Sequence, residues 1–363
     1  TRVKNLAFAE FLGRVANEGP DAFYVGSNAR AIASATVTSK INPSLMTAAD
    51  VTRYQPKRQP PLCGNYRGYR ICGMGPSSSG GTTVFAILKQ LERFDMAKLG
   101  PHSPTAWHLI AESQRLAYAD REKYLADAAF VSVPVAGLMD PAYLARRSAL
   151  ISPDKALASV SAGIPDGAPQ TCPPIRMPER GTSHFVVVDR WGGVVSETST
   201  IESAFGSGLM VNGYYLNNEL TDFSFEPVKD GCRVANRVEG GKRPRSSMSP
   251  TIVYAPDGEV RLAVGAAGGT TIIAQVAKII VGVIDWNLTA QDAIALPTIF
   301  APGETVYLER GTWLADMAPE LQALGHSIGY RPPGTFKANA IERVNGRWVG
   351  AADPRSEGAA VSQ

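Results

Sequence analysis

Residues 183–200 form the strand–turn–strand pattern that most constrains the fold of this chain. The stretch "SHFVVVDRWGGVVSETST" alternates apolar and polar residues on both sides of a Gly192-Gly193 pair. A period of two is typical of β-strands, and paired glycines favour a tight turn. The pattern therefore predicts a hairpin with strands at 183–189 and 194–200. If its turn centres on residues 191 and 192, Thr200 lies opposite Ser183, and a slip of one residue changes that pairing.

The segment before this hairpin has no such regularity. Residues 151–181 contain six prolines and no clear apolar periodicity, which predicts a long loop. Long loops inside compact proteins are commonly functional or disordered. The loop ends at Gly181, so Thr182 stands directly before the first strand. Taken alone, a Gly-Thr pair at this place is explained by the turn preference of glycine and the strand preference of threonine.

Helical and strand patterns occur along the remainder of the chain. Apolar residues recur at helical spacing in 5–18, 104–127 and 271–286, and further strands are predicted at 251–255 and 259–265. The stretch "PSSSGG" at 76–81 is interpreted as a turn before a helix, with its serines as alternative candidate nucleophiles. Helices in both halves and strands in the second half favour a layered α/β fold.

The composition gives little support to several classes of function. Apolar residues make up 44% and charged residues 19% of the 363 residues, as in an ordinary globular protein. The net charge of +3 comes without a long basic run, and no apolar stretch reaches transmembrane length. Four cysteines without CxxC spacing, four histidines, and the absence of HExxH and phosphate-loop motifs do not favour a metal or nucleotide site. An enzyme of this kind is expected to use a side-chain nucleophile.

Ordered motifs in both halves are more specific. Those of the second half are "GTSHFVVVD", "TST" with "FGSG" (198–208), "LNNELTDFS" (216–224), "GKRPRSSMSPTIV" (241–253) and "GAAGGTTII" (265–273). Those of the first half include "GPDAFYVG" (19–26), "GPSSSGG" (75–81) and "AESQRLAYADREKYLAD" (111–127). The series closely resembles the gamma-glutamyltransferase (gamma-glutamyltranspeptidase) family of N-terminal-nucleophile hydrolases, and the resemblance covers nearly the whole chain.

The resemblance implies a four-layer αββα sandwich and a chain that cuts itself in two. The cut falls after Gly181, which makes Thr182 the first residue of the small subunit and the nucleophile. Residues 1–181 are then the C-terminal part of the large subunit, residues 182–363 are the small subunit, and both halves form one αββα unit. The upstream part of the large subunit, which carries an arginine for the donor carboxylate, is expected to lie outside this sequence. A freed α-amine, with a pKa of about 7.7–8.0, is a suitable base for a threonine hydroxyl.

The other site residues are carried over from matching motif positions. The resemblance implies that Thr200 hydrogen-bonds the nucleophile, that the backbone amides of Gly268 and Gly269 form an oxyanion hole, that Ser246 and Ser247 hold the substrate α-carboxylate, and that Glu219 and Asp222 hold its α-ammonium. Paired amides before a helix suit a developing negative charge. Glu202 stands where many family members have asparagine, and it adds negative charge to the expected pocket.

The implied function is cleavage of γ-glutamyl amides such as glutathione through a threonine acyl-enzyme, with transfer to water or to amino-acid or peptide amines. No metal or organic cofactor is expected, and neither is a nucleic-acid partner; the two subunits are expected to pair after cleavage. The alternatives are a family acylase or amidohydrolase acting on another donor, such as a glutaryl-cephalosporin or an oxamate-like amide, and a non-catalytic homologue. The family implies a periplasmic or secreted protein, while the sequence leaves a cytoplasmic location open.

Overall fold

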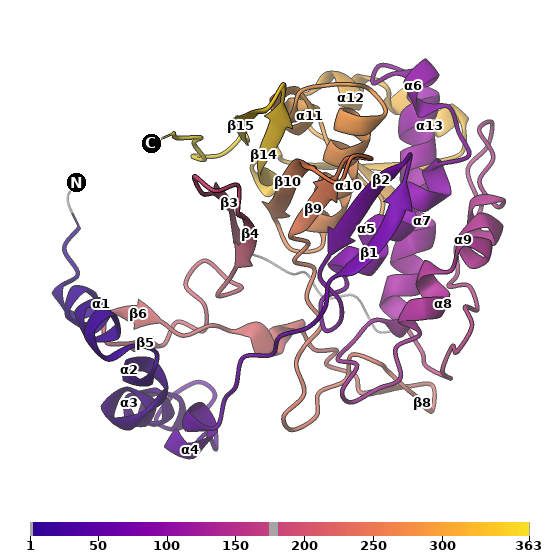
Figure 1. Cartoon of the computed structure of the whole chain (residues 1–363). Helices are drawn as coiled ribbons and strands as arrows, with labels where there is room; N and C mark the ends of the chain where they lie inside the picture. Colours follow the sequence, from indigo (N-terminus) through magenta and orange to yellow (C-terminus); the bar gives the residue numbers. More distant parts are fainter. Residues whose placement is uncertain (1–2, 174–180, 363) are drawn as a thin grey trace. The chain divides into compact units, whose positions relative to one another are not determined.

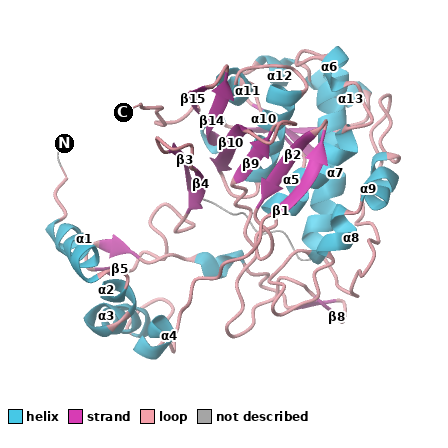
Figure 2. Ribbon diagram, viewed as in Figure 1, coloured by secondary structure: helices cyan, strands magenta, loops and turns pink. Residues whose placement is uncertain are grey.

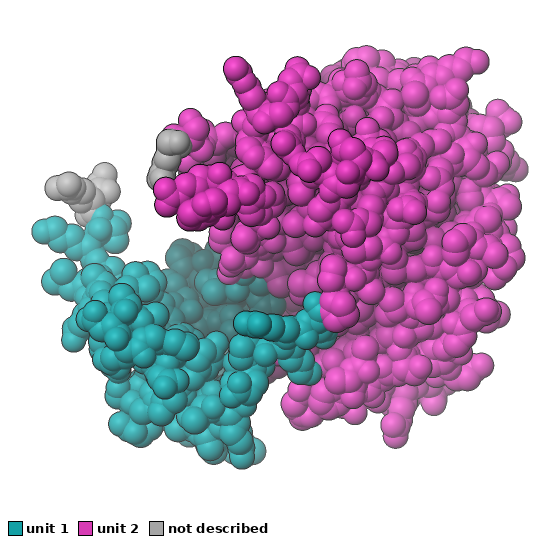
Figure 3. Space-filling model, viewed as in Figure 1, with its two compact units in different colours: residues 1–59, 200–219 teal, residues 60–199, 220–363 magenta. Residues whose placement is uncertain are grey.

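The computed structural model describes residues 3–173 and 181–362, and these residues form two compact units (Figures 1 and 3). Unit 1 comprises residues 1–59 with 200–219, and unit 2 comprises residues 60–199 with 220–363. This division follows contacts within the uncut chain. It differs from the predicted subunit boundary between residues 181 and 182, which stays a prediction.

Unit 1 consists of four helices and a short hairpin. The elements are α1 (Leu6–Glu18), α2 (Asp21–Tyr24), α3 (Gly26–Val37), α4 (Ala48–Thr52), β5 (Met210–Val211) and β6 (Tyr214–Tyr215). Helix α1 confirms the helix expected at 5–18: the Asn5 side chain accepts a hydrogen bond from the Phe8 amide, and Gly19 ends the helix with a φ of 72°. The Phe11 ring packs against Phe23 and Tyr214, so the hairpin shares an aromatic core with the helices.

Unit 2 is built on a six-stranded antiparallel sheet (Figure 2). Its strands follow the order β1 (Leu62–Tyr66), β2 (Tyr69–Gly73), β9 (Thr251–Tyr254), β10 (Val260–Ala267), β14 (Lys337–Val344) and β15 (Arg347–Ala352). Strands from both sides of Gly181 therefore pair directly, as β2 does with β9. The strands expected at 251–255 and 259–265 are confirmed.

The remaining elements of unit 2 complete its framework. The helices are α5 (Gly80–Leu91), α6 (Met96–Leu99), α7 (Pro104–Tyr124), α8 (Val135–Met139), α9 (Pro141–Ser148), α10 (Thr271–Ile284), α11 (Ala290–Ala295), α12 (Trp313–Asp316) and α13 (Ala318–Ala323). Two 3-10 turns, η1 (Glu219–Asp222) at the boundary between the units and η2 (Pro333–Thr335), are also present. A three-stranded sheet contains β11 (Ile299–Phe300), β12 (Thr305–Glu309) and β13 (Ser327–Arg331), and a small hairpin contains β7 (Val228–Lys229) and β8 (Cys232–Arg233).

A helical layer covers one face of the large sheet. Helix α10 packs against β10 and α5, and α5 in turn packs against α7. The expected helix start at Ser103 is confirmed, since its hydroxyl accepts a hydrogen bond from the Ala106 amide. The apolar stretch 271–286 contains the buried helix α10, which ends at Ile284. None of the described helices is long and apolar enough to cross a bilayer.

The predicted hairpin packs against the other face of the large sheet. It consists of β3 (Ser183–Val188) and β4 (Val194–Ser199), and it contacts β10 and β14. Side chains of a strand alternate between the two faces, and Leu262 and Val264 of β10 belong to the core shared with the helices. Gly265 faces the opposite way, toward His184 of the hairpin. Helices, sheet and hairpin thus form successive layers in the order α, β, β.

Three contacts hold the hairpin on the sheet. The ring of His184 lies where a side chain of Gly265 would be, since a Cβ added to Gly265 would meet the ring at 2.3 Å. The Asn339 amide donates to the carbonyl oxygen of His184 at 2.9 Å, and the Ser196 hydroxyl donates to the carbonyl oxygen of Val264 at 3.3 Å. The start of β3 therefore lies over the C-terminal part of β10.

The close approach at Gly265 leads to a stability prediction. In Gly265→Ala the added methyl group collides with the His184 ring, and we expect a loss of about 1–3 kcal/mol in the free energy of unfolding, measured by denaturant titration. His184→Ala removes the obstructing ring, so Gly265→Ala should cost much less in that background. Equal costs in both backgrounds would show that the two residues do not constrain each other.

Candidate active site

Thr182 lies directly before β3 and directly after Gly181. Gly181 has a φ of 67°, in the region that favours glycine, and the Thr182 hydroxyl donates to the Gly181 carbonyl oxygen. The sequence left two registers open, with Ser183 opposite Thr200 or with a slip of one residue. The structure has the second register, in which Ser183 pairs with Ser199. Thr182 and Thr200 each stand one residue beyond this last pair. The predicted loop before Gly181 contains no helix or strand in residues 151–173, and its residues 174–180 lie outside the described residues.

Gly268 and Gly269 connect β10 to helix α10, and both have positive φ values, 122° and 59°. A Cβ at Gly268 would lie 2.5 Å from the Thr335 carbonyl oxygen, so only glycine fits there. The Gly268 carbonyl accepts from the amide and the hydroxyl of Thr271, and the Gly269 carbonyl accepts from Ile272. These bonds use the two carbonyl groups and not the N–H groups. A pair of backbone amides before a helix N-terminus is suited to an anionic oxygen.

Ser246 is held by the "PSSSGG" segment at the start of α5. Ser79 donates twice to the Ser246 carbonyl oxygen, from its amide at 2.8 Å and from its hydroxyl at 2.7 Å. The Ser246 amide donates to the carbonyl oxygen of Ser77 at 3.2 Å. The expected turn is confirmed, since α5 begins at Gly80. Its serines Ser77 and Ser79 contact the main chain of Ser246, one of the two candidate carboxylate-binding residues.

A buried guanidinium group connects these two serine segments. Arg121 of helix α7 donates from Nε to the Ser79 hydroxyl at 2.8 Å and from Nη2 to the Ser247 hydroxyl at 2.5 Å. The carboxylate of Glu122 pairs with Arg121 at 2.5 Å and with Arg245 at 2.8 Å. Two guanidinium groups therefore share the carboxylate of Glu122, and one of them also donates to Ser247. Hydrogen-bond donors of this kind suit a carboxylate ligand.

Glu219 and Asp222 both lie on the 3-10 turn η1. The Asn217 side chain accepts from the Glu219 amide at 3.0 Å, and the Asn236 side chain donates to the Asp222 carbonyl oxygen at 2.6 Å. Asn236 also accepts from the Arg245 amide at 2.9 Å. One side chain therefore links the backbone at Asp222 to the residue directly before Ser246.

Thr200 and Glu202 begin the second segment of unit 1. The Thr200 hydroxyl accepts from the Glu202 amide at 2.8 Å. Glu202 is buried, and its carboxylate accepts from the Ser203 hydroxyl at 2.7 Å and from the Asn218 amide at 2.9 Å. Its φ of 70° lies in the left-handed region, where asparagine is enriched among residues with side chains. The backbone thus gives a physical reason for an asparagine preference at this position.

His184 was not singled out by the sequence, although it is two residues from Thr182. Burial lowers the pKa of its imidazole to about 4, so the ring is neutral near pH 7. Its Nδ1 lies 2.9 Å from the Thr198 hydroxyl oxygen. Ser79 and Arg121 were also missed as supporting residues, because the residues that they contact are far away in the sequence.

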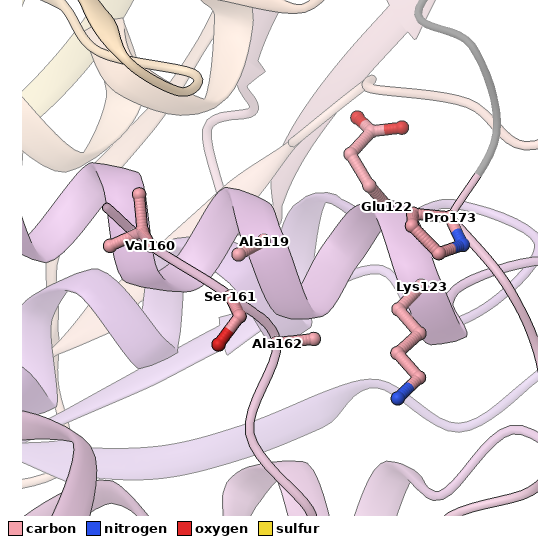
Figure 4. A pocket seen from close by; sticks show the side chains of 7 residues that line it. All are labelled: Ala119, Glu122, Lys123, Val160, Ser161, Ala162 and Pro173. Atoms are coloured by element: carbon pink, nitrogen blue, oxygen red, sulfur yellow. The ribbon is translucent and has the colours of Figure 1, made fainter.

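A cavity of about 360 Å³ lies between helix α7 and the loop that precedes residue 174 (Figure 4). Its lining residues are Ala119, Glu122, Lys123, Val160, Ser161, Ala162 and Pro173. It includes none of the predicted site residues. Among residues 3–173 and 181–362, no group of three or more His, Cys, Asp or Glu side chains is placed to hold a metal ion.

Comparison with known proteins identifies the relatives of the chain. The sequence profile of the family described as Gamma-glutamyltranspeptidase matches residues 1–363. Over 358 residues the chain is 37% identical to a Glutathione hydrolase proenzyme of Bacillus subtilis (strain 168). This match covers 96% of this chain and 60% of that protein. It is 35% identical over 358 residues to the Acylase ACY 1 proenzyme of Pseudomonas sp. (strain SE83), with 98% and 60% covered. The chain thus spans about three fifths of the length of these relatives.

The fold is also found in a solved structure. The crystal structure of cephalosporin acylase from Bacillus halodurans matches with a TM-score of 0.84 at 24% identity, covering 98% of this chain and 62% of that chain. This likeness shows the fold, and it confirms the predicted α/β class.

The contacts of Ser79 predict a structural rather than a nucleophilic role. Ser79→Ala removes one partner each from Arg121 and from the Ser246 carbonyl, and we expect a loss of about 1–3 kcal/mol in the free energy of unfolding. The exposed Ser27 supplies the control, since Ser27→Ala should stay within about 0.5 kcal/mol of the wild type. Unchanged stability together with complete loss of amidase activity would instead identify Ser79 as a nucleophile.

Proposed function

The chain belongs to the gamma-glutamyltranspeptidase family, and from this premise we propose that it is part of an autoprocessing γ-glutamyltransferase and hydrolase. Its reaction is transfer of the acyl group of a γ-glutamyl amide, such as glutathione, to water or to an amine. One observation carries the proposal: the Thr182 hydroxyl contacts the carbonyl group of Gly181 directly before the first strand of the hairpin β3–β4. Relatives named Glutathione hydrolase proenzyme support it.

Maturation starts from the same contact. The Thr182 oxygen attacks the carbonyl carbon of Gly181, the peptide C–N bond breaks, and an ester replaces the amide. Water then hydrolyses the ester, which leaves a carboxylate on Gly181 and a free amine and hydroxyl on Thr182. The two polypeptides stay together as large and small subunits, because strands such as β2 and β9 pair across the cut.

In the mature protein the new α-amine acts as the base. With a pKa of about 7.7–8.0 it is partly deprotonated near neutral pH, and it takes the proton of the Thr182 hydroxyl as that oxygen attacks the donor carbonyl. The N–H groups of Gly268 and Gly269 stabilise the oxyanion, and Thr200 hydrogen-bonds the nucleophile. The amine returns its proton to the leaving group, and water or an acceptor amine then resolves the acyl-enzyme. The chemistry requires no metal or organic cofactor.

Recognition of the donor uses opposite charges. Ser246 and Ser247 hold the α-carboxylate, and Arg121 donates to the Ser247 hydroxyl. Glu219 and Asp222 hold the α-ammonium. Glu202 adds a third carboxylate, whose bonds to Ser203 and Asn218 keep it anchored.

An acylase acting on another donor is the second candidate. The 35% identity to an Acylase ACY 1 proenzyme supports it. A glutaryl donor has the same acyl chain length as a γ-glutamyl donor but carries no α-ammonium. The acidic residues therefore decide between the two functions.

The maturation step predicts two polypeptides in the purified full-length protein, the C-terminal one beginning Thr-Ser-His-Phe in N-terminal sequencing. Thr182→Ala should remain one chain, because no hydroxyl is left to attack Gly181. Thr182→Ser, which keeps the hydroxyl, should still be cut. An uncut wild type with full amidase activity would contradict the assignment of Thr182.

The acidic residues predict donor selectivity. In Glu219→Gln with Asp222→Asn, each lost contact to a charged group contributes about 1.5–3 kcal/mol, so kcat/KM for γ-glutamyl-p-nitroanilide should fall at least tenfold. The kcat/KM for glutaryl-p-nitroanilide should be unchanged or higher. Adding Glu202→Asn should deepen the loss if that carboxylate shares the ammonium.

The control for this comparison is Glu226→Gln, an exposed charge in the same region of the chain that should alter neither value. Equal losses for both donors would mean that Glu219 and Asp222 are structural. A wild-type preference for the glutaryl donor would favour the acylase.

A further inference from the structure

All four cysteines are paired, in two disulfides of different kinds. Cys63 and Cys72 face each other on the paired strands β1 and β2, and both precede Gly181. Cys172 and Cys232 are 60 residues apart in sequence, with Cα atoms 5.8 Å apart, and they lie on opposite sides of the bond between Gly181 and Thr182. Neither pairing is evident from the spacing of the cysteines.

The backbone around the second disulfide is fixed on both sides. The Cys172 amide donates to the Arg233 carbonyl oxygen at 3.3 Å, and Cys172 forms a parallel bridge with Val234. The neighbouring Thr171 hydroxyl donates to the Lys123 carbonyl oxygen at 2.9 Å. Val234 is fully buried. The two cysteines are therefore brought together by main-chain contacts as well as by the sulfur–sulfur bond.

We propose that Cys172–Cys232 becomes an interchain disulfide when the chain is cut after Gly181, so that the mature protein is a covalently joined pair of polypeptides. This inference rests on the proposed self-cleavage. The cut consumes one water: its hydroxyl goes to the Gly181 carbonyl carbon and its hydrogen to the Thr182 nitrogen. The disulfide is already present in the uncut chain, so neither sulfur changes oxidation state and no oxidant is needed at this step.

The link joins the end of the first polypeptide to the substrate-binding part of the second. Cys172 lies in the loop that leads to Gly181, and the chain after Cys232 runs through Asn236, which bonds to Asp222 and Arg245. A covalent link turns reassociation of two chains into an intramolecular event at a high effective concentration. The mature protein should therefore keep its subunits together on dilution. Disulfides persist in oxidising compartments, which agrees with the periplasmic or secreted location that the family implies.

The test is gel electrophoresis in SDS of the purified full-length protein, with free thiols blocked by N-ethylmaleimide before lysis. We expect one band without reductant, near the position of the uncut chain, and two bands with reductant. Two bands under both conditions would overturn the interchain disulfide and leave the proposed cleavage standing. One band under both conditions would overturn both, because an uncut chain has no second polypeptide to join.

Two matched variants separate the roles of the disulfides. Cys172→Ser should give two bands even without reductant, whereas Cys63→Ser with Cys72→Ser, which removes the disulfide within one polypeptide, should still give one. If the double variant also releases the second polypeptide, the link is not at Cys172.

A peptide map of the wild type identifies the linked cysteines even where a variant fails to fold. A digest without reductant should contain one disulfide-linked species with the Cys172 and Cys232 peptides, together with a separate peptide that begins at Thr182. Alkylated Cys172 and Cys232 peptides in that digest would overturn the proposal.

Discussion

The packing of the His184 ring against Gly265 determines where the hairpin β3–β4 lies on the large sheet, and the position of Thr182 follows from it. Because Gly265 has no side chain, the imidazole occupies the space above β10, and burial keeps the ring uncharged. The Asn339 amide binds the main chain of the same histidine. Thr182 is two residues away, so its location depends on this contact with the sheet. This gives the candidate nucleophile a rigid support, as an exact acyl-transfer geometry requires.

The support for the candidate carboxylate site has a similar physical basis. Ser247 receives a hydrogen bond from Arg121, which comes from a helix of the first half, while Ser246 is held by Ser79, also from the first half. Both serines belong to the second half of the chain. The candidate substrate-binding residues therefore depend on contacts across the proposed cut, so they need the two polypeptides to stay associated after such a cleavage.

Local patterns in the sequence were sufficient to predict the hairpin, the capped helices and the strand pair at 251–265, because period and capping residues are local signals. The register of the hairpin was left open, since a turn of two glycines permits a slip of one residue. The roles of Ser79 and Arg121 and the pairing of Cys172 with Cys232 could not be predicted, because each joins residues that are distant in sequence. At Glu202 the sequence and the structure each supply one part of the picture. The departure from asparagine is visible in the sequence, whereas the left-handed backbone at this residue is visible only in the structure.

In the proposed reaction Thr182 becomes the N-terminal nucleophile of a γ-glutamyl acyl transfer. The most direct measurement is to quench the full-length protein during turnover of a slow γ-glutamyl donor and to map the acylated peptide by mass spectrometry. We expect an adduct of one glutamyl residue, bound as an ester to the Thr182 side chain of a peptide with a free N-terminus. An adduct on a serine of residues 76–81, or on Thr182 within an uncut chain, would contradict it.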